Sequence, residues 1–78
     1  MKLKTIADFY GADRVRIYNG CLAEDHKIAD FALGYMSLKN EIFSRIDIAE
    51  YGNKEVSFMG IKIGTLNNDK EVVLEIIL

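Results

Sequence analysis

Residues 54–78 read KEVSFMGIKIGTLNNDKEVVLEIIL, and this stretch decides the fold. Its last part is apolar on both sides of a strand: one face carries Val72, Leu74, Ile76 and Leu78, and the other carries Val73 and Ile77. A strand of this kind is either central, with both faces covered, or one half of an interface. The sequence therefore predicts two neighbouring strands over residues 54–63 and 71–78, with a turn over residues 64–69 between them.

The first of these strands changes the side on which its apolar residues fall. Val56 and Phe58 share one parity, whereas Ile61 and Ile63 share the other. Gly60 lies at the change, and an extra unpaired residue in a strand produces such a switch. The sequence therefore predicts a β-bulge at Gly60.

Toward the N-terminus, strand signals alternate with helix signals. Residues 14–18 (RVRIY) alternate with a period of two and end at Asn19-Gly20, which predicts a hairpin with a return strand over residues 21–23. Capping residues and apolar spacing predict short helices over residues 5–10, 25–35 and 38–45, followed by a strand over residues 46–51. We therefore predict a single α+β domain over residues 1–78, with a mostly antiparallel sheet of about four to five strands and two or three short helices packed on one face.

Composition and charge narrow the function classes. Half of the 78 residues are apolar, and ten basic and twelve acidic residues leave a net charge of −2. The basic residues are dispersed, without the patch that nucleic-acid binders show, so we expect no direct nucleic-acid contact. No apolar run approaches the roughly 20 residues of a membrane span, and the N-terminus does not resemble a signal peptide. Cys21 is the single cysteine, so no internal disulfide can form, and we expect a cytoplasmic location.

Few residues offer catalytic or ligand chemistry. His26 follows Cys21 closely, but a nucleophilic Cys–His pair needs a third, orienting group, and no family signature surrounds this one. Asp25, His26 and Asp30 could gather on the surface, although a helix cap and solvated charges explain them more simply than a metal site does. The glycines fit no phosphate-binding pattern. We therefore expect no enzyme, no catalytic residue, no metal and no cofactor.

Tyrosine and arginine side chains suggest a contact surface. Tyr18 shares a strand face with Arg14 and Arg16, and both residue types are enriched at interface hot spots. Val15 and Ile17 are expected to point into the core. Unless the second predicted helix covers the opposite face, these three side chains are expected to stand in water without an acidic strand partner. The alternative interpretation is that the tyrosines are core residues or good strand formers. The predicted partner-binding residues are Arg14, Arg16, Tyr18 and Tyr35.

Three stretches carry a resemblance to a known class: residues 15–20 (VRIYNG), 41–46 (EIFSRI) and 73–76 (VLEI). There, and in the β-rich tail, the chain resembles small accessory proteins that phages and other mobile elements of bacteria encode. The resemblance implies a compact, cofactor-free protein that binds a host macromolecule; anti-CRISPR inhibitors of defence systems belong to this class. It assigns no role to an individual residue.

We therefore expect a non-enzymatic protein-binding module. In the version that the resemblance favours, a phage-encoded inhibitor or regulator blocks a bacterial nucleic-acid enzyme, such as a CRISPR effector, by steric occlusion. Two alternatives remain open. One is a self-associating accessory protein that forms a homodimer through its C-terminal strand, which would help a core of this small size. The other is a small-ligand sensor with its pocket at a dimer interface.

Overall fold

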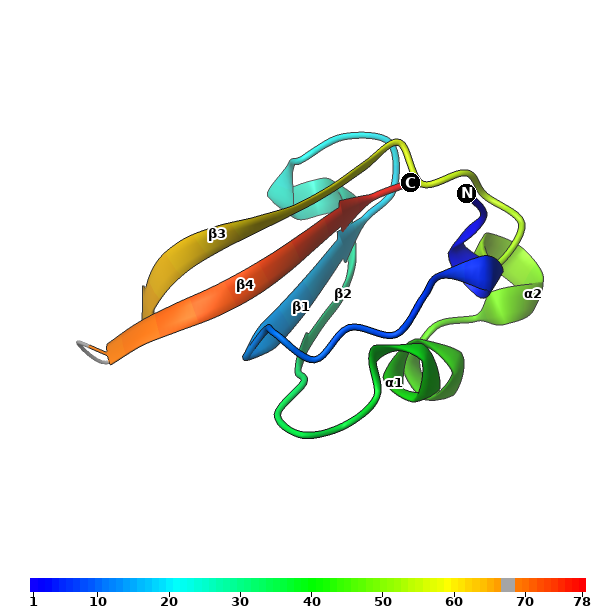
Figure 1. Ribbon diagram of the computed structural model, residues 1–78. Helices are drawn as coiled ribbons and strands as arrows, with labels where there is room; N and C mark the ends of the chain where they lie inside the picture. The colour runs from blue at the N-terminus through cyan, green and yellow to red at the C-terminus, as the bar shows by residue number, and fades with distance from the viewer. Residues whose placement is uncertain (67–68) are drawn as a thin grey trace.

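One mixed sheet of four strands organises the chain. The computed structural model describes residues 1–66 and 69–78, and its strands are β1 (Arg14–Tyr18), β2 (Lys27–Ala32), β3 (Phe58–Leu66) and β4 (Asp69–Ile77). Their order across the sheet is β2-β1-β4-β3. β1 runs parallel to β4, whereas β2 and β3 each pair antiparallel with their neighbour. Figure 1 shows the β3–β4 hairpin extending past the ends of β1 and β2, away from the helices.

The C-terminal strand β4 lies in the centre of this sheet. Val73, Leu74 and Ile76 are each at most 2% exposed, which explains why the strand is apolar on both faces. Of the two placements that the sequence left open, the structure shows the central one. Along residues 73–77 both edges of β4 are occupied, one by β1 and the other by β3. A second copy therefore cannot add to β4 there, and a strand that extends the sheet must use β2 or β3.

The helical elements are short. They are α1 (Leu38–Arg45), α2 (Ile48–Tyr51) and two 3-10 turns, η1 (Leu3–Thr5) and η2 (Glu24–His26). α1 begins where the sequence predicts, because the Ser37 hydroxyl accepts a hydrogen bond from the Asn40 backbone N–H at 3.3 Å. Figure 1 shows α1, α2 and η1 together on one side of the sheet. Among the described residues, no helix is long and apolar enough to cross a membrane.

The hydrophobic core fills the space between these helical elements and β1, β2 and β4. Val15 and Ile17 are fully buried in it, as predicted for the inward face of β1. The other members of the buried cluster come from the N-terminal segment, β2 and the loops at its ends, α1 and β4: Leu3, Ile6, Ala12, Phe31, Leu33, Leu38, Ile42, Ile46, Leu74 and Ile76. Among the residues whose burial is described, β3 contributes none to this cluster.

The predicted helix over residues 5–10 is wrong. Only η1 forms in this region, and the chain then runs in an irregular path to β1. Asp8 does not cap its own segment. Its carboxylate instead accepts hydrogen bonds from the Ser37 hydroxyl at 2.6 Å and the Lys39 N–H at 3.0 Å, so it caps α1 from 31 residues away. These bonds hold the pKa of Asp8 below its ordinary value of 3.8.

The predicted helix over residues 25–35 is also wrong, and so is the return strand over residues 21–23. Residues 27–32 form β2, the antiparallel neighbour of β1, and a loop with η2 connects the two strands. Ala29 and Phe31 face Ile17 and Val15 across the pair. The register shifts between Ile17 and Tyr18, which leaves Ile28 as an extra residue. This bulge breaks the two-residue alternation that would have identified the strand.

Two further predictions need correction. Residues 46–51 form no strand: Asp47 accepts a hydrogen bond from the Glu50 N–H at 3.3 Å and caps α2. Gly60 forms no bulge, because β3 pairs residue by residue with β4 from Phe58 to Leu66. The Phe58 ring instead lies over Gly60, where an added Cβ would come within 2.6 Å of the ring.

The α+β class is confirmed, but its details differ from the prediction. The sheet has four strands and contains a parallel pair, and there are two α-helices where three were placed along the sequence. β3 runs on through Leu66, so the first half of the turn predicted over residues 64–69 is strand. Residues 67–68 of that predicted turn lie outside the described residues.

Candidate functional site

The predicted strip on β1 is occupied by internal ion pairs. Asp30 on β2 pairs with Arg16 in the sheet register, and its carboxylate receives hydrogen bonds from Arg14 Nη1 at 2.7 Å and Arg16 Nε at 3.3 Å. Lys27 Nζ lies 3.3 Å from the same carboxylate. The expectation that these arginines lack an acidic strand partner is wrong, because the partner lies on a segment that was predicted to be helical.

Further ion pairs extend across this open face of the sheet. Arg14 Nε also lies 3.4 Å from Glu71, and Lys62 Nζ lies 3.2 Å from Glu75 Oε2. Glu75 is only 7% exposed, and among the described residues its Oε2 has no hydrogen-bond partner. Lys62 lies close to it, and Arg16 is its neighbour across the β1–β4 pair. Four cations and four carboxylates share the face: Arg14, Arg16, Lys27 and Lys62 with Glu24, Asp30, Glu71 and Glu75. A face with balanced charge is a poor site for phosphate groups.

Asp30 is the centre of this network, and its titration offers a test. Partial burial alone would raise the pKa of Asp30, but the hydrogen bonds from Arg14 and Lys27 and the charges of Arg14 and Arg16 hold it below 3.8. A carboxyl whose pKa is lowered by folding stabilises the folded state above its unfolded pKa, and loses that contribution as the pH falls through its folded pKa.

We expect Asp30→Asn to lower the free energy of unfolding by about 1–2 kcal/mol at pH 7, since the side chain is partly buried and bonded to charged groups. The loss should shrink as the pH falls below 3.8 and through the lower folded pKa of Asp30. Urea unfolding at pH 7 and at a series of acidic pH values measures it. Asp25→Asn is the matched control, because the Asp25 side chain is 84% exposed. Equal effects of the two substitutions at pH 7 would show that the network contributes nothing.

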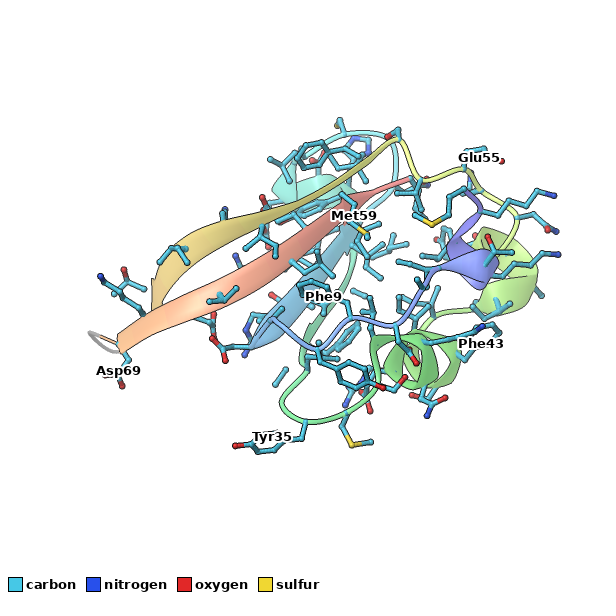
Figure 2. The ribbon with its side chains drawn as sticks, in the orientation of Figure 1. Phe9, Tyr35, Phe43, Glu55, Met59 and Asp69 are labelled. Atoms are coloured by element: carbon cyan, nitrogen blue, oxygen red, sulfur yellow. The ribbon has the colours of Figure 1, made fainter. Side chains whose placement is uncertain are left out.

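The two tyrosines among the predicted contact residues differ in solvent exposure. Tyr18 is 6% exposed, so little of its side chain is accessible to a partner. Tyr35 is fully exposed, and Figure 2 shows it pointing away from the fold into solvent. With Tyr10 it flanks a shallow, open hollow of about 350 Å³, which is also lined by Gly11, Ala12, Asp13 and Gly34. Of the predicted partner-binding residues, Tyr35 is fully exposed, whereas the Arg14 and Arg16 side chains are 25% and 29% exposed and engaged in ion pairs.

A larger exposed apolar surface lies on β3. Four large hydrophobic side chains of this strand are between 40% and 62% exposed: Phe58, Met59, Ile61 and Ile63. In the sheet register, three of them face residues of β4: Met59 faces Ile76, Ile61 faces Leu74, and Ile63 faces Val72. All six side chains therefore lie on the side of the sheet against which the helices pack. The helices end before they reach β3, and Figure 2 shows Met59 on this uncovered side. We call Met59, Ile61 and Ile63 the β3 row.

The backbone N–H and C=O groups of the same three residues point away from β4, toward the open edge of the sheet. The Leu78 N–H donates to Tyr18 on β1, and Val72 exchanges hydrogen bonds with Asp13 ahead of β1. Backbone groups alternate along a strand, so residues 72, 74 and 76 of β4 turn toward β1 and residues 73, 75 and 77 turn toward β3. Their partners in β3 are Lys62, Gly60 and Phe58. The N–H and C=O groups of the β3 row therefore face outward, where the described residues supply no strand.

The two outer strands of the sheet differ in how they are protected. Natural sheets protect an edge with charges, bulges, proline or short length. β2 has six residues, a bulge, and Lys27 and Asp30 in ion pairs. β3 has nine residues paired without interruption, and its one charged side chain, Lys62, lies on the other face beside Glu75. β3 is therefore the edge that is open to another strand.

Cys21 and His26 form no visible reactive pair. The His26 Nδ1 lies 2.9 Å from the Asn19 carbonyl oxygen, which it can only approach as a donor, so the ring closes the loop between β1 and η2. Cys21 is exposed on that loop. In residues 1–66 and 69–78 no three His, Cys, Asp or Glu side chains are grouped closely enough to hold a metal ion.

The β3 row was not predicted to be an exposed surface. The signal was present, because Ile61 and Ile63 break the parity of Val56 and Phe58, but the break was interpreted as a bulge. It instead marks two faces: Phe58 lies on the open face, and the β3 row lies on the helical side. Comparison with known proteins finds no matching family model, no matching curated protein and no matching solved structure.

Proposed function

We propose that the chain is a non-enzymatic protein-binding module that takes a partner strand along the outer edge of β3. The observation that carries this proposal is the coincidence, on the β3 row, of exposed apolar side chains with outward-facing backbone groups. Strand addition to an open sheet edge uses both: backbone hydrogen bonds supply affinity, and alternate side chains supply specificity. An edge of this length without protection is otherwise a hazard of aggregation.

Two classes of partner fit this mode. The resemblance to phage accessory proteins favours a bacterial nucleic-acid enzyme, a CRISPR effector for example, that the bound module blocks by steric occlusion. A self-associating accessory protein is the second candidate, and the unprotected state of β3 favours it. In either case Tyr35, beside the hollow that Tyr10 also lines, is proposed as a secondary contact.

A comparison of two lysine variants tests the mode of binding. Ile61→Lys places a charge in the middle of the β3 row, and Leu22→Lys adds the same charge at a loop residue of nearly equal exposure, 53% against 52%. The immobilised chain and both variants are incubated with bacterial lysate, with and without nuclease. We expect Ile61→Lys to weaken retention of the bound protein by at least about 30-fold, the equivalent of a hot spot, and Leu22→Lys to leave it unchanged.

Matching melting curves of the three proteins establish that both variants are folded. Retention that is unaffected by Ile61→Lys would remove the β3 edge as the binding surface. Retention that nuclease abolishes would show that nucleic acid bridges the contact, and would contradict a direct protein partner.

A further inference from the structure

We infer that the strand which occupies the β3 edge is β3 of a second copy of this chain, paired antiparallel about a two-fold axis at Ile61. This inference rests on the proposed use of the β3 edge and names its occupant. A two-fold contact presents the same patch from both copies, so the patch must complement itself. The sequence of β3 meets that condition on both faces of the sheet.

On the helical side the pairing joins apolar side chains only. With the axis at Ile61, this residue faces its own equivalent, and Met59 faces Ile63 of the second copy. Because all three residues direct their backbone groups outward, every one of these pairs is a hydrogen-bonded pair. Six side chains, each 40–62% exposed in the single chain, then line one continuous row across the junction.

On the open side the same register places large side chains opposite glycine. Phe58 faces Gly64 of the second copy, and Lys62 faces Gly60 of the second copy. The Phe58 ring of each copy lies over its own Gly60, so the Lys62 side chain of the other copy lies beside an aromatic ring there. Lys62 keeps its carboxylate partner, because it lies 3.2 Å from Glu75 within its own chain.

Neighbouring registers fit less well. An axis at Lys62 sets two ammonium groups directly opposite each other, which is unfavourable. An axis at Gly60 opposes Lys62 to Phe58 and takes Ile63 out of contact with Met59 of the second copy. The register at Ile61 is therefore the one that a two-fold axis favours.

The size of the contact sets its expected strength. Six partly exposed side chains and two strand edges bury roughly 1,000 Å² in total, near the lower limit of about 1,200 Å² for specific, stable interfaces. A contact of this size belongs to the weak, reversible class, and we expect a dissociation constant of roughly 10–100 μM.

Sedimentation equilibrium of the full chain from about 5 to 500 μM tests the inference. Wild type should pass from monomer to dimer across this range. Ile61→Lys brings two ammonium groups together on the axis and should raise the dissociation constant at least about 30-fold, whereas Leu22→Lys should leave it unchanged. A wild-type chain that stays monomeric throughout, or a dimer that Ile61→Lys does not weaken, would overturn the inference.

The outcomes separate this inference from the function proposed above. A monomeric chain that still retains a lysate protein in an Ile61-dependent manner would mean that β3 binds a different protein, so that the module function stands and self-pairing falls. A chain that neither dimerises nor retains a protein through Ile61 would contradict both.

Discussion

Ile76→Ala is expected to lower the free energy of unfolding by about 2–5 kcal/mol. The Ile76 side chain is fully buried in the middle of β4, the strand that joins both halves of the sheet. The substitution removes three buried carbon atoms, so the free energy gained by burying them is lost. It also leaves a cavity between the flanking elements, which costs further stability. For a core of this size the loss would be most of the total stability, which is expected to be about 3–5 kcal/mol. Urea unfolding followed by far-UV circular dichroism measures it.

Ile63→Ala is the matched control, because it removes the same atoms from a strand of the same sheet. Its side chain is 62% exposed, so the substitution should change the free energy of unfolding by less than about 0.5 kcal/mol in a dilute solution of single chains. Equal losses from the two substitutions would contradict the assignment of β4 to the centre and β3 to the open edge.

The parts of the fold that the sequence predicts correctly are those with strong local signals. β4 is apolar on both faces, β1 alternates between buried and paired side chains, and α1 begins at a serine cap. In each case the residues that form the element also contain the information that identifies it. The hairpin between β3 and β4 follows from the same kind of pattern.

The parts that fail depend on distant residues. The bulge at Ile28 interrupts the alternation of apolar and polar residues along β2. The segment is recognisable as a strand only from its pairing with β1, which the local sequence does not contain. Asp8 lies in the segment over residues 5–10 that was predicted to be helical, but its carboxylate caps α1 instead. The parallel pairing of β1 with β4 joins residues that are far apart along the chain. Neither strand's own sequence indicates which strand it pairs with or in which direction.

The charge environment of the predicted strip on β1 was misjudged for a related reason. Arg14 and Arg16 looked free because Asp30 was assigned to a helix, and the correct strand assignment neutralises both of them. The exposure of Ile61 and Ile63 depends on where the helices stop, which is a property of the packed chain and not of the β3 sequence. Tyr35 is fully exposed, which excludes the alternative that it is a core residue, and its role in binding stays a prediction.

Amide hydrogen exchange is expected to distinguish the two sides of β3 in a single chain. The amides of Gly60 and Lys62 face β4 and exchange only when the sheet opens, which slows them by roughly 10²–10⁴-fold if total stability is about 3–5 kcal/mol. The amides of Met59, Ile61 and Ile63 face outward and should exchange at nearly the rate of an unstructured peptide. This alternation requires no knowledge of a partner.

The same amides, recorded by NMR at about 5 μM and about 500 μM, test the central claim that β3 is an edge that accepts a second strand. The account predicts that Met59, Ile61 and Ile63 exchange fast in the dilute sample and become protected in the concentrated one, while Gly60 and Lys62 are slow in both. Outer amides that exchange at the same fast rate in both samples would contradict pairing of β3 with a second copy. Outer amides that are already slow in the dilute sample would contradict the open edge itself.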